Sequence, residues 1–282
     1  MLETILCRTC GNAFPVDDDL PDVCPICADD RQYLRDDGQV WLPSAEIVGT
    51  HEFTLTEPEP GLTRIEVTPS IGIGHQPVLI STDAGNLLWE PSGYVDDAMV
   101  QAVAERGGVA AVAASHPHLV GAAVVWAREF GAPFWFNTDD RRWITHPDRS
   151  IELWQDRRQI LPGLTLVQAG GHFAGSSVVH WAAGAGGSGV IFSGDTIAVT
   201  ANHTASFMRS YPNNIPLSPR LVRQIVDAVE PYDFDRIYGA FGAAIDHDAK
   251  RIVHESADRY IGWLTDTIRD PDERALQISM VP

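Results

Sequence analysis

The segment Ser115-His116-Pro117-His118, which follows the apolar run 109–114, decides how the rest of the chain is interpreted. The apolar run has the continuous hydrophobic character of a strand that is covered on both faces. Pro117 disfavours a helix at the residue before it, so we expect His116 in extended backbone. Because extended backbone places residues i and i+2 on the same side, both imidazoles are predicted to face one ion. Neutral imidazole is the commonest metal-binding side chain.

Two later fragments supply the remaining ligands of this candidate metal site. Gly170-Gly171-His172, with Gly175-Ser176 behind it, brings a third histidine. Ser193-Gly194-Asp195-Thr196 brings an aspartate at the end of an apolar strand candidate, 190–193. The four side chains therefore predict a metal ion bound at the rim of a sheet.

Length and charge limit the class of protein. The chain has 282 residues, 44% of them hydrophobic, and a formal net charge of -18. The length allows one large domain or two smaller ones. The acidity argues against a nucleic-acid partner and against an anionic membrane surface. Since neither a signal peptide nor a run of bilayer length is visible, we expect a cytoplasmic protein that acts on a small-molecule substrate.

All four cysteines lie near the N-terminus, as Cys7, Cys10, Cys24 and Cys27. The pattern is C-x2-C, thirteen residues, then C-x2-C. In a reducing compartment it predicts a structural Zn²⁺ site with four thiolate ligands, with redox or incidental cysteines as the alternative. Such a closed site contributes to folding rather than to chemistry. It could brace the main domain, recruit a partner, or join two subunits into a homo-oligomer.

The pattern of apolar runs predicts two parts, a cysteine knuckle and connector at 1–43 and a main domain at 44–282. The main domain begins β-rich and ends in alternating strands and helices, which predicts two sheets between helices. Helices are expected after Asp96, over 119–130, from Ser218, and over a last segment that carries Ile252 to Ile268. Strands are expected at 53–55, 64–67, 78–81, 87–89, 133–136, 151–154, 164–167 and 178–181, and a last strand at 234–238.

From about Glu46 to the C-terminus, the order of these fragments resembles the metallo-β-lactamase superfamily of hydrolases. The resemblance implies an α/β fold, an αββα sandwich, preceded here by a small zinc-ribbon-like module. The superfamily's first motif is H-x-H-x-D-H, and its first two histidines match His116 and His118. Its third histidine lies in a Gly-His-x-x-Gly-Ser setting and matches His172. Its Gly-Asp-Thr aspartate, which commonly bridges two metals, matches Asp195.

The departures from the superfamily pattern concern the second metal. Val120 and Gly121 stand where the first motif has Asp and His, and Phe241 stands where the last histidine is expected in a Gly-His-Gly turn. By resemblance the protein is mononuclear, holding one further ion, Zn²⁺ or alternatively Fe²⁺. The expected function is a metal-dependent hydrolase in which metal-bound water attacks an ester, thioester or lactone-type carbonyl. Asp195 is expected to act as a ligand or as a catalytic general base.

Two other functions remain open at this stage. Two histidines with Asp195 resemble the facial triad of non-haem iron oxygenases, and some superfamily members are iron dioxygenases that act on persulfides. A non-catalytic protein whose metal stiffens a binding pocket is the third hypothesis. His75 is interpreted as a loop residue rather than as a ligand, and a place at the mouth of the pocket is the alternative left open for it. The other candidate pocket residues are His203, Asp139, Asp140 and Phe241.

Overall fold

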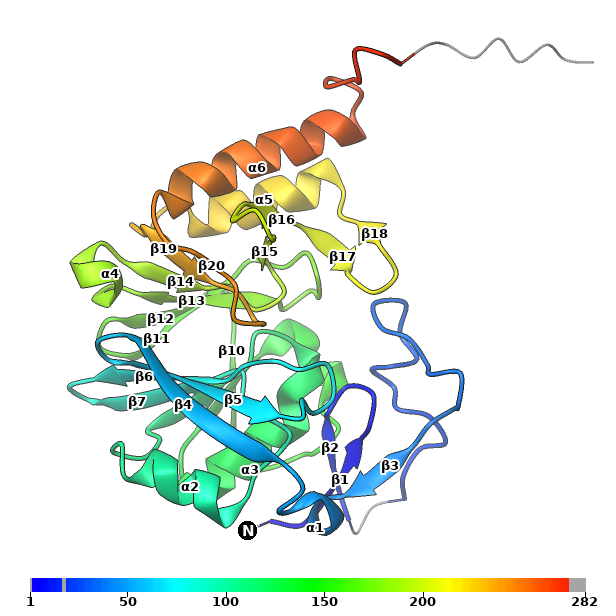
Figure 1. Cartoon of the computed structure of the whole chain (residues 1–282), viewed down its shortest axis with the longest axis vertical. Coiled ribbons are helices and arrows are strands. Elements are labelled where there is room, and N and C mark those ends of the chain that lie inside the picture. The colour runs from blue at the N-terminus through cyan, green and yellow to red at the C-terminus, as the bar shows by residue number, and fades with distance from the viewer. Residues whose placement is uncertain (1, 17–18, 274–282) are drawn as a thin grey trace, which may run out of the picture.

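Two β-sheets pack face to face, and helices cover both outer faces of the pair (Figure 1). The computed structural model describes residues 2–16 and 19–273. The first sheet has the strand order β10-β9-β8-β7-β6-β5-β4. Its outer face is covered by α2 (Asp97–Ala104) and α3 (Val120–Phe130). The second has the order β11-β12-β13-β14-β19-β20 and lies under α5 (Pro219–Val229) and α6 (Ala249–Leu264). The αββα sandwich predicted from the sequence is therefore confirmed.

The bounds of the remaining elements are as follows. The first sheet consists of β4 (Glu52–Glu59), β5 (Leu62–Thr68), β6 (Val78–Thr82), β7 (Gly85–Trp89), β8 (Ala111–Ala113), β9 (Phe134–Asn137) and β10 (Ile151–Trp154). The second consists of β11 (Arg157–Leu161), β12 (Leu164–Gln168), β13 (Ser177–Trp181), β14 (Val190–Phe192), β19 (Arg236–Tyr238) and β20 (Ala244–Ile245). Shorter elements are α1 (Ser44–Ile47), α4 (Gly184–Gly187), the 3₁₀ turns η1 (Pro117–Leu119) and η2 (Thr138–Trp143), and the pairs β15 (Ala198–Val199) with β16 (Ala205–Ser206) and β17 (Met208–Ser210) with β18 (Ile215–Pro216).

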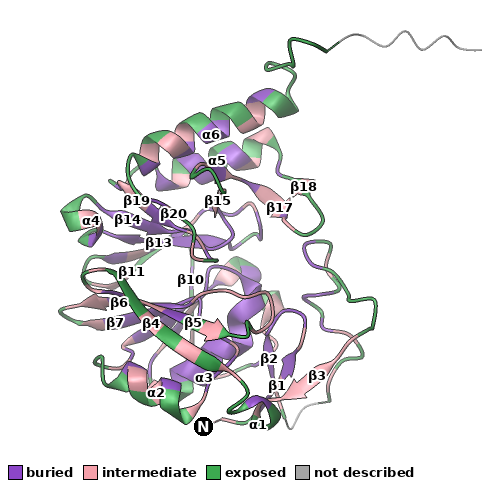
Figure 2. Cartoon of the chain, in the orientation of Figure 1, coloured by how far each residue is buried: buried purple, intermediate pink, exposed green. Residues whose placement is uncertain are grey.

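Alternating strand residues build three hydrophobic layers. On β6, Leu79 packs toward α2 and α3, whereas its neighbour Ile80 packs between the two sheets. On β14, Phe192 lies between the sheets, whereas Ile191 packs toward α5 and α6. This follows from the period of two in a strand, and it explains why β8 and β14 are apolar at every position. Figure 2 shows the resulting contrast between buried strands and the exposed outer side of α6.

Several short strands were not predicted from the sequence. Strands β15 to β18 are two or three residues long, and β11 is mostly exposed, so neither length nor hydrophobicity marks them. The strand predicted as the last one, β19, is followed by β20, and Ile268 lies beyond the end of α6. Within the described part of the chain, none of the helices is both long and apolar enough to cross a bilayer.

The N-terminal residues form a small sheet of their own beside α3 (Figure 1). It has the order β2-β1-β3, from β1 (Thr4–Cys7), β2 (Ala13–Pro15) and β3 (Trp41–Pro43). The four cysteines pack with Phe14 and Ile26 in a separate hydrophobic cluster. We call residues 2–43 the N-terminal module; its boundary with the main domain at residue 43 stays a prediction.

The N-terminal module docks on the first turn of α3 through a close backbone approach. A Cβ atom at Gly121 would lie 1.8 Å from the carbonyl oxygen of Ala13, so only glycine fits there. Asn12 fixes the contact, because its Oδ1 accepts from the Gly121 N–H at 2.8 Å and its Nδ2 donates to Thr145 Oγ1 at 2.6 Å. The first N–H groups of a helix have no partner within the helix, so this bond satisfies one of them.

Replacing Gly121 by alanine tests this contact. Because the added methyl group meets backbone that cannot rotate away, we expect Gly121→Ala to lower the free energy of unfolding by about 1–3 kcal/mol. Thermal and urea unfolding measure the change. Glu129→Ala, on the exposed C-terminal turn of the same helix, is the control and should leave stability within about 0.5 kcal/mol. Equal stability of the two variants would contradict the docking described here.

Candidate metal centre

Three loops that follow strands bring the predicted ligands together. His116 and His118 follow β8, His172 follows β12, and Asp195 follows β14. His116 has extended backbone, with φ -161° and ψ 177°, as predicted. The expectation that His118 shares that extended backbone is wrong, because His118 lies in the 3₁₀ turn η1 that begins at Pro117. The turn arises because proline fixes φ near -65° and suits the first turn of a helix.

The four side chains converge on one point in the interior. Each offers one ligand atom, and these atoms all lie within 4.8 Å of one another. Asp195 Oδ2 is 3.6 Å from His116 Nε2 and 3.9 Å from His172 Nε2, and His116 Nε2 is 2.7 Å from His118 Nδ1. His118 Nε2 and both ring nitrogens of His172 are buried without a hydrogen-bond partner in the described structure. Since buried polar atoms are rarely left unpaired, three imidazoles and a carboxylate of this kind fit a bound divalent transition-metal ion.

Burial sets the protonation of the three histidines. Burial lowers the pKa of His116 well below its usual value, that of His118 to about 3, and that of His172 to a smaller extent. Burial alone would raise the pKa of Asp195, but its interactions with His116, His75 and His172 hold it well below its usual range. The site therefore offers neutral imidazoles and an ionised carboxylate, which are the protonation states that bind metal.

Residues outside the ligand set hold the ligands in place. Ser115 Oγ lies 2.6 Å from His116 Nδ1, which leaves Nε2 of that ring directed at the cluster. The Arg31 Nε–H donates to the backbone carbonyl of His172 at 2.6 Å, and the Arg31 guanidinium lies 4.3 Å from the centre of the Phe173 ring. The Arg31 side chain is itself fixed by an ion pair with Asp29 at 2.5 Å. The segment interpreted as a connector thus reaches the metal centre, and no local sequence pattern predicts this contact.

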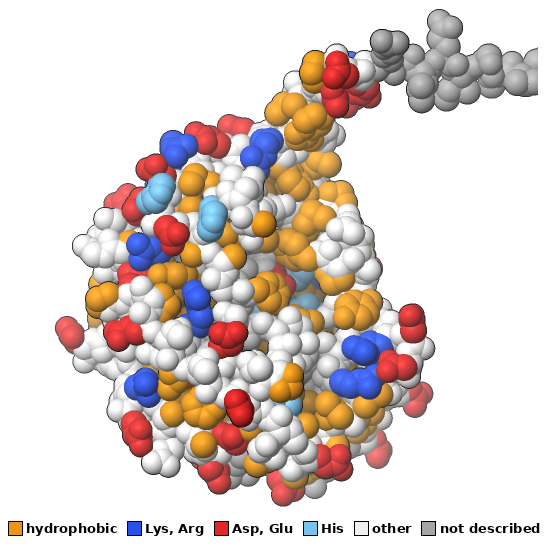
Figure 3. Space-filling model, in the orientation of Figure 1, with side chains coloured by type: hydrophobic (Ala, Val, Ile, Leu, Met, Phe, Trp, Pro, Cys, Tyr) orange, Lys and Arg blue, Asp and Glu red, His pale blue; other side chains and the backbone are white. Residues whose placement is uncertain are grey.

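A cavity of about 320 Å³ opens onto the ligands. Its wall includes Arg31 and Tyr33 from the N-terminal module, Ile73 from a loop of the main domain, and Tyr211 and Phe241. Figure 3 shows histidine side chains in a hollow bordered mainly by hydrophobic ones. A cleft of this size, with aromatic walls and a few convergent polar groups, is typical of a small-molecule site.

Only some of the predicted pocket residues line the cavity. Phe241 lines the cavity and is half exposed, as expected. His203 does not line it; the side chain is exposed and its Nδ1 contacts the Ala244 carbonyl at 2.8 Å. Asp139 and Asp140 do not line it either, because the two carboxylates hold the back of the His172 loop. Asp139 accepts from Gln168 at 2.7 Å and Asp140 accepts from the Gly175 N–H at 3.0 Å.

The position of His75 differs most from the prediction. It was interpreted as a loop residue rather than as a ligand, but its side chain is only 2% exposed and lies beside the ligand cluster. Its Nε2 is 3.6 Å from Glu90 Oε2 and 3.6 Å from Asp195 Oδ1. Glu90 was not singled out from the sequence, although an acidic residue directly after the buried strand β7 is a signal that could have found it.

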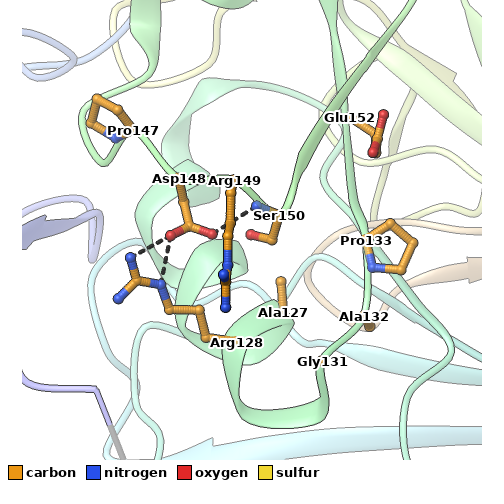
Figure 4. Close-up of a pocket in the computed structure, with 10 residues that line it drawn as sticks. All are labelled: Ala127, Arg128, Gly131, Ala132, Pro133, Pro147, Asp148, Arg149, Ser150 and Glu152. Carbon is orange, nitrogen blue, oxygen red and sulfur yellow. Dashed lines mark hydrogen bonds and ion pairs between the residues drawn. The ribbon is translucent and has the colours of Figure 1, made fainter.

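A larger hollow lies away from the histidines, beside the C-terminal end of α3 (Figure 4). It measures about 860 Å³ and is lined by the end of α3, by the loop 131–133 before β9, and by the loop 147–150 that leads into β10. Its charged side chains bind each other: Arg128 Nε donates to Asp148 at 2.6 Å, and Asp148 accepts from the Ser150 N–H at 2.8 Å. No group of three metal-binding side chains was found there among the described residues, so we assign no chemistry to this hollow.

The four cysteines form a second candidate metal site within the N-terminal module. Cys7 Sγ is 3.7 Å from Cys27 Sγ, and Cys10 Sγ is 3.8 Å from Cys24 Sγ. A disulfide needs about 2.05 Å, so the cysteines are unpaired. Four sulfurs at the corners of a tetrahedron around an ion 2.3 Å away lie about 3.8 Å apart. The thiolate cluster therefore fits a tetrahedral metal ion.

The arrangement as a whole matches solved structures of one fold. DIM-1 metallo-β-lactamase superposes with a TM-score of 0.58 at 11% identity, over 74% of this chain and 98% of that one. The mono-zinc form of the metallo-β-lactamase FIM-1 from Pseudomonas aeruginosa gives 0.57 at 15% identity, over 76% and 96%. VMB-1 gives 0.57 at 11% identity, over 76% and 98%. The chain therefore has the metallo-β-lactamase fold, as its motifs predicted.

Sequence comparison identifies a relative of this chain and so its family. It is 39% identical over 260 residues to an uncharacterized protein, YmaE, of Bacillus subtilis (strain 168), across 91% of this chain and 95% of YmaE. The chain belongs to the same family as YmaE. A scan against protein-family models gives no match.

Replacing Arg31 tests whether the N-terminal module supports the metal centre. Arg31→Met keeps the aliphatic stem and removes the bond to the His172 carbonyl. Because partners of a metal ligand typically change metal affinity by about 10–100-fold, we expect a loss of that size at the histidine site. Metal retained after dialysis against a graded chelator measures it. Arg35→Met, exposed in the same connector, is the control, and equal retention by both variants would contradict the assignment.

Proposed function

We propose that this protein is a metal-dependent hydrolase that cleaves an ester, thioester or lactone-type bond in a small molecule. The observation that carries the proposal is the buried convergence of His116, His118, His172 and Asp195 at the floor of a cavity. A divalent ion bound there would polarise a carbonyl group and lower the pKa of a coordinated water, which is the chemistry that hydrolysis needs. The fold, shared with metallo-β-lactamases, supports the same reaction class.

The proposal makes Asp195 a ligand rather than a general base. A general base works best when its pKa is near the operating pH, and the pKa of Asp195 is held well below its usual range by the histidines. Its Oδ2 faces two of the three histidine nitrogens, which suits a shared ion. The Tyr211 hydroxyl donates to the backbone carbonyl of Asp195 at 2.9 Å and so orients this ligand.

A single catalytic ion is part of the proposal. Val120 is fully buried in the core, Gly121 lies against the N-terminal module, and Phe241 has no metal-binding atom, so the superfamily's own ligands for a second ion are missing. The comparison with the mono-zinc form of FIM-1 supports a one-ion state in this fold. We take Zn²⁺ as the ion at both the thiolate and the histidine sites, because zinc suits four sulfurs as well as imidazole with carboxylate.

The cavity wall limits the substrate. Tyr211, Phe241 and Ile73 give it an apolar and aromatic surface. Arg31, its cationic residue, is already bound to Asp29 and to the His172 carbonyl. We therefore propose an uncharged acyl compound small enough for about 320 Å³. Four unpaired cysteines and an acidic surface support a cytoplasmic protein without a nucleic-acid or membrane partner.

The test is hydrolysis of a panel of esters, thioesters and lactones by zinc-loaded protein, with and without oxygen. We expect turnover that does not depend on oxygen, and a loss of at least about 100-fold in kcat/KM in His172→Gln. His203→Gln, which changes an exposed histidine outside the cavity, should retain full activity. Turnover only with Fe²⁺ and oxygen would assign an oxygenase instead. Equal activity of the two variants would refute the histidine site as the catalytic centre.

A further inference from the structure

His75 and Glu90 form a buried pair of metal-binding side chains that the proposed reaction does not use. Their side chains are 2% and 1% exposed, and both lie next to Asp195, which is 8% exposed. His75, Glu90 and His116 form a group whose ligand atoms lie within 4.8 Å of one another. A histidine and a carboxylate at this depth are costly unless something binds them.

The facing atoms of His75 and Glu90 are unpartnered, and the distances from His75 to the two carboxylates suit coordination. His75 Nε2 is 3.6 Å from Glu90 Oε2 and 3.6 Å from Asp195 Oδ1, which is too long for hydrogen bonds. Ligand atoms at 2.0–2.2 Å from a tetrahedral ion lie about 3.3–3.6 Å apart. Neither His75 ring nitrogen nor Glu90 Oε2 has a hydrogen-bond partner in the described structure.

The other oxygen of Glu90 fixes the carboxylate in place. Its Oε1 accepts from the backbone N–H of Ser115 at 2.5 Å, directly before the histidine pair. Because one oxygen is bound in this way, the carboxylate cannot rotate Oε2 away from His75 without breaking that bond. The same residue thus ties the His116 loop to strand β7 and leaves one oxygen directed at His75.

The two carboxylate oxygens of Asp195 face different sets of residues. Oδ2 faces His116 and His172, and Oδ1 faces His75. The His75 ring stacks on Phe241, with centroids 5.0 Å apart and planes at 13°. The Gln76 N–H donates to the Ala240 carbonyl at 2.9 Å, which joins the two loops. An imidazole from a different part of the chain therefore lies beside the position where the superfamily has its last histidine.

We propose that His75, Glu90 and Asp195 hold a second divalent cation beside the three-histidine ion, through ligands that the superfamily's second site does not use. One nitrogen and two carboxylate oxygens suit Zn²⁺, Mn²⁺ or Cd²⁺. This site binds more weakly than the first, because it has fewer ligands of its own and a neighbouring cation repels the second one. At low metal concentration the centre is mononuclear, as proposed above, and the second ion enters at higher concentration. The inference rests on the proposed function for the location of the first ion.

Counting Cd²⁺ ions per chain tests this inference on the full-length protein. Equilibrium dialysis against rising Cd²⁺ should give two tight equivalents and a third, weaker one. NMR of ¹¹³Cd should then show one resonance from the thiolate site and two from sites with nitrogen and oxygen ligands, the last appearing only at the higher concentration. Both readouts are independent of catalytic activity.

Two variants remove the second site by different means. Glu90→Gln retains an oxygen that accepts from Ser115 but removes the charge, and His75→Phe retains an aromatic ring on Phe241 but removes both nitrogens. In each, the third equivalent and its resonance should be lost while the first two remain, which also shows that the variant is folded. His203→Gln, an exposed histidine outside the cavity, controls for surface binding and should retain all three.

The outcomes separate this inference from the proposed function. Two tight equivalents with no third would overturn the second site and leave the hydrolase proposal intact. A third equivalent that persists in Glu90→Gln and His75→Phe would show adventitious binding to the acidic surface, and would also overturn it. A protein that binds three ions as described but hydrolyses no acyl substrate would refute the proposed function and leave the second site standing.

Discussion

The backbone of the cysteine knuckle packs directly against backbone of the main domain. The loops that carry the metal ligands lie next to this contact. Two glycines make the approach possible. Gly121 lies under Ala13, and Gly72 lies so close to Cys10 and Gly11 that a Cβ atom there would be 2.5 Å from the backbone of both. Gly121 lies in the first turn of the helix that follows the histidine pair, and Gly72 lies in the loop that carries His75. Because backbone on both sides cannot yield, the knuckle fixes where both loops lie.

This docking also explains how the chain differs from the pattern of its superfamily. A histidine at Gly121 would occupy the space that Ala13 fills, so the residue that could bind a second ion there is excluded by the module that braces the site. On the other side of the cluster, Arg31 of the same module holds the carbonyl of His172. Of the three roles open for the knuckle, the contacts support bracing of the main domain; recruitment of a partner and joining of subunits remain untested.

The fold and the main ligands could be predicted from the sequence because each has a strong local signal. The apolar run 109–114 marks a buried strand, Asp96 and Ser218 cap their helices, and each ligand follows a strand in an unambiguous order. The spacing of the four cysteines is equally specific. Such features depend on neighbouring residues only, so they can be recognised without knowledge of the tertiary structure.

The remainder of the site depends on contacts between distant segments, which no local pattern encodes. Arg31 is one charged residue in a polar connector, and only docking against His172, 141 positions away, gives it a role. His75 looks like a loop residue because it follows Gly72 and Gly74, and its burial comes from Phe241 and Asp195. The misplacement of His203, Asp139 and Asp140 has the same origin, since a position near a strand end does not determine which face of the loop a side chain takes.

The central claim is that one chain builds two chemically separate metal sites, a closed thiolate site in the module and a histidine site in the main domain. Elemental analysis of wild type and of a His116→Ala/His118→Ala double variant, both purified from zinc- and iron-supplemented cells, tests it most directly. The account predicts two ions per wild-type chain and one in the variant, with zinc retained by the cysteines. An equal metal content in both proteins would contradict the claim, because the histidines would then hold no ion.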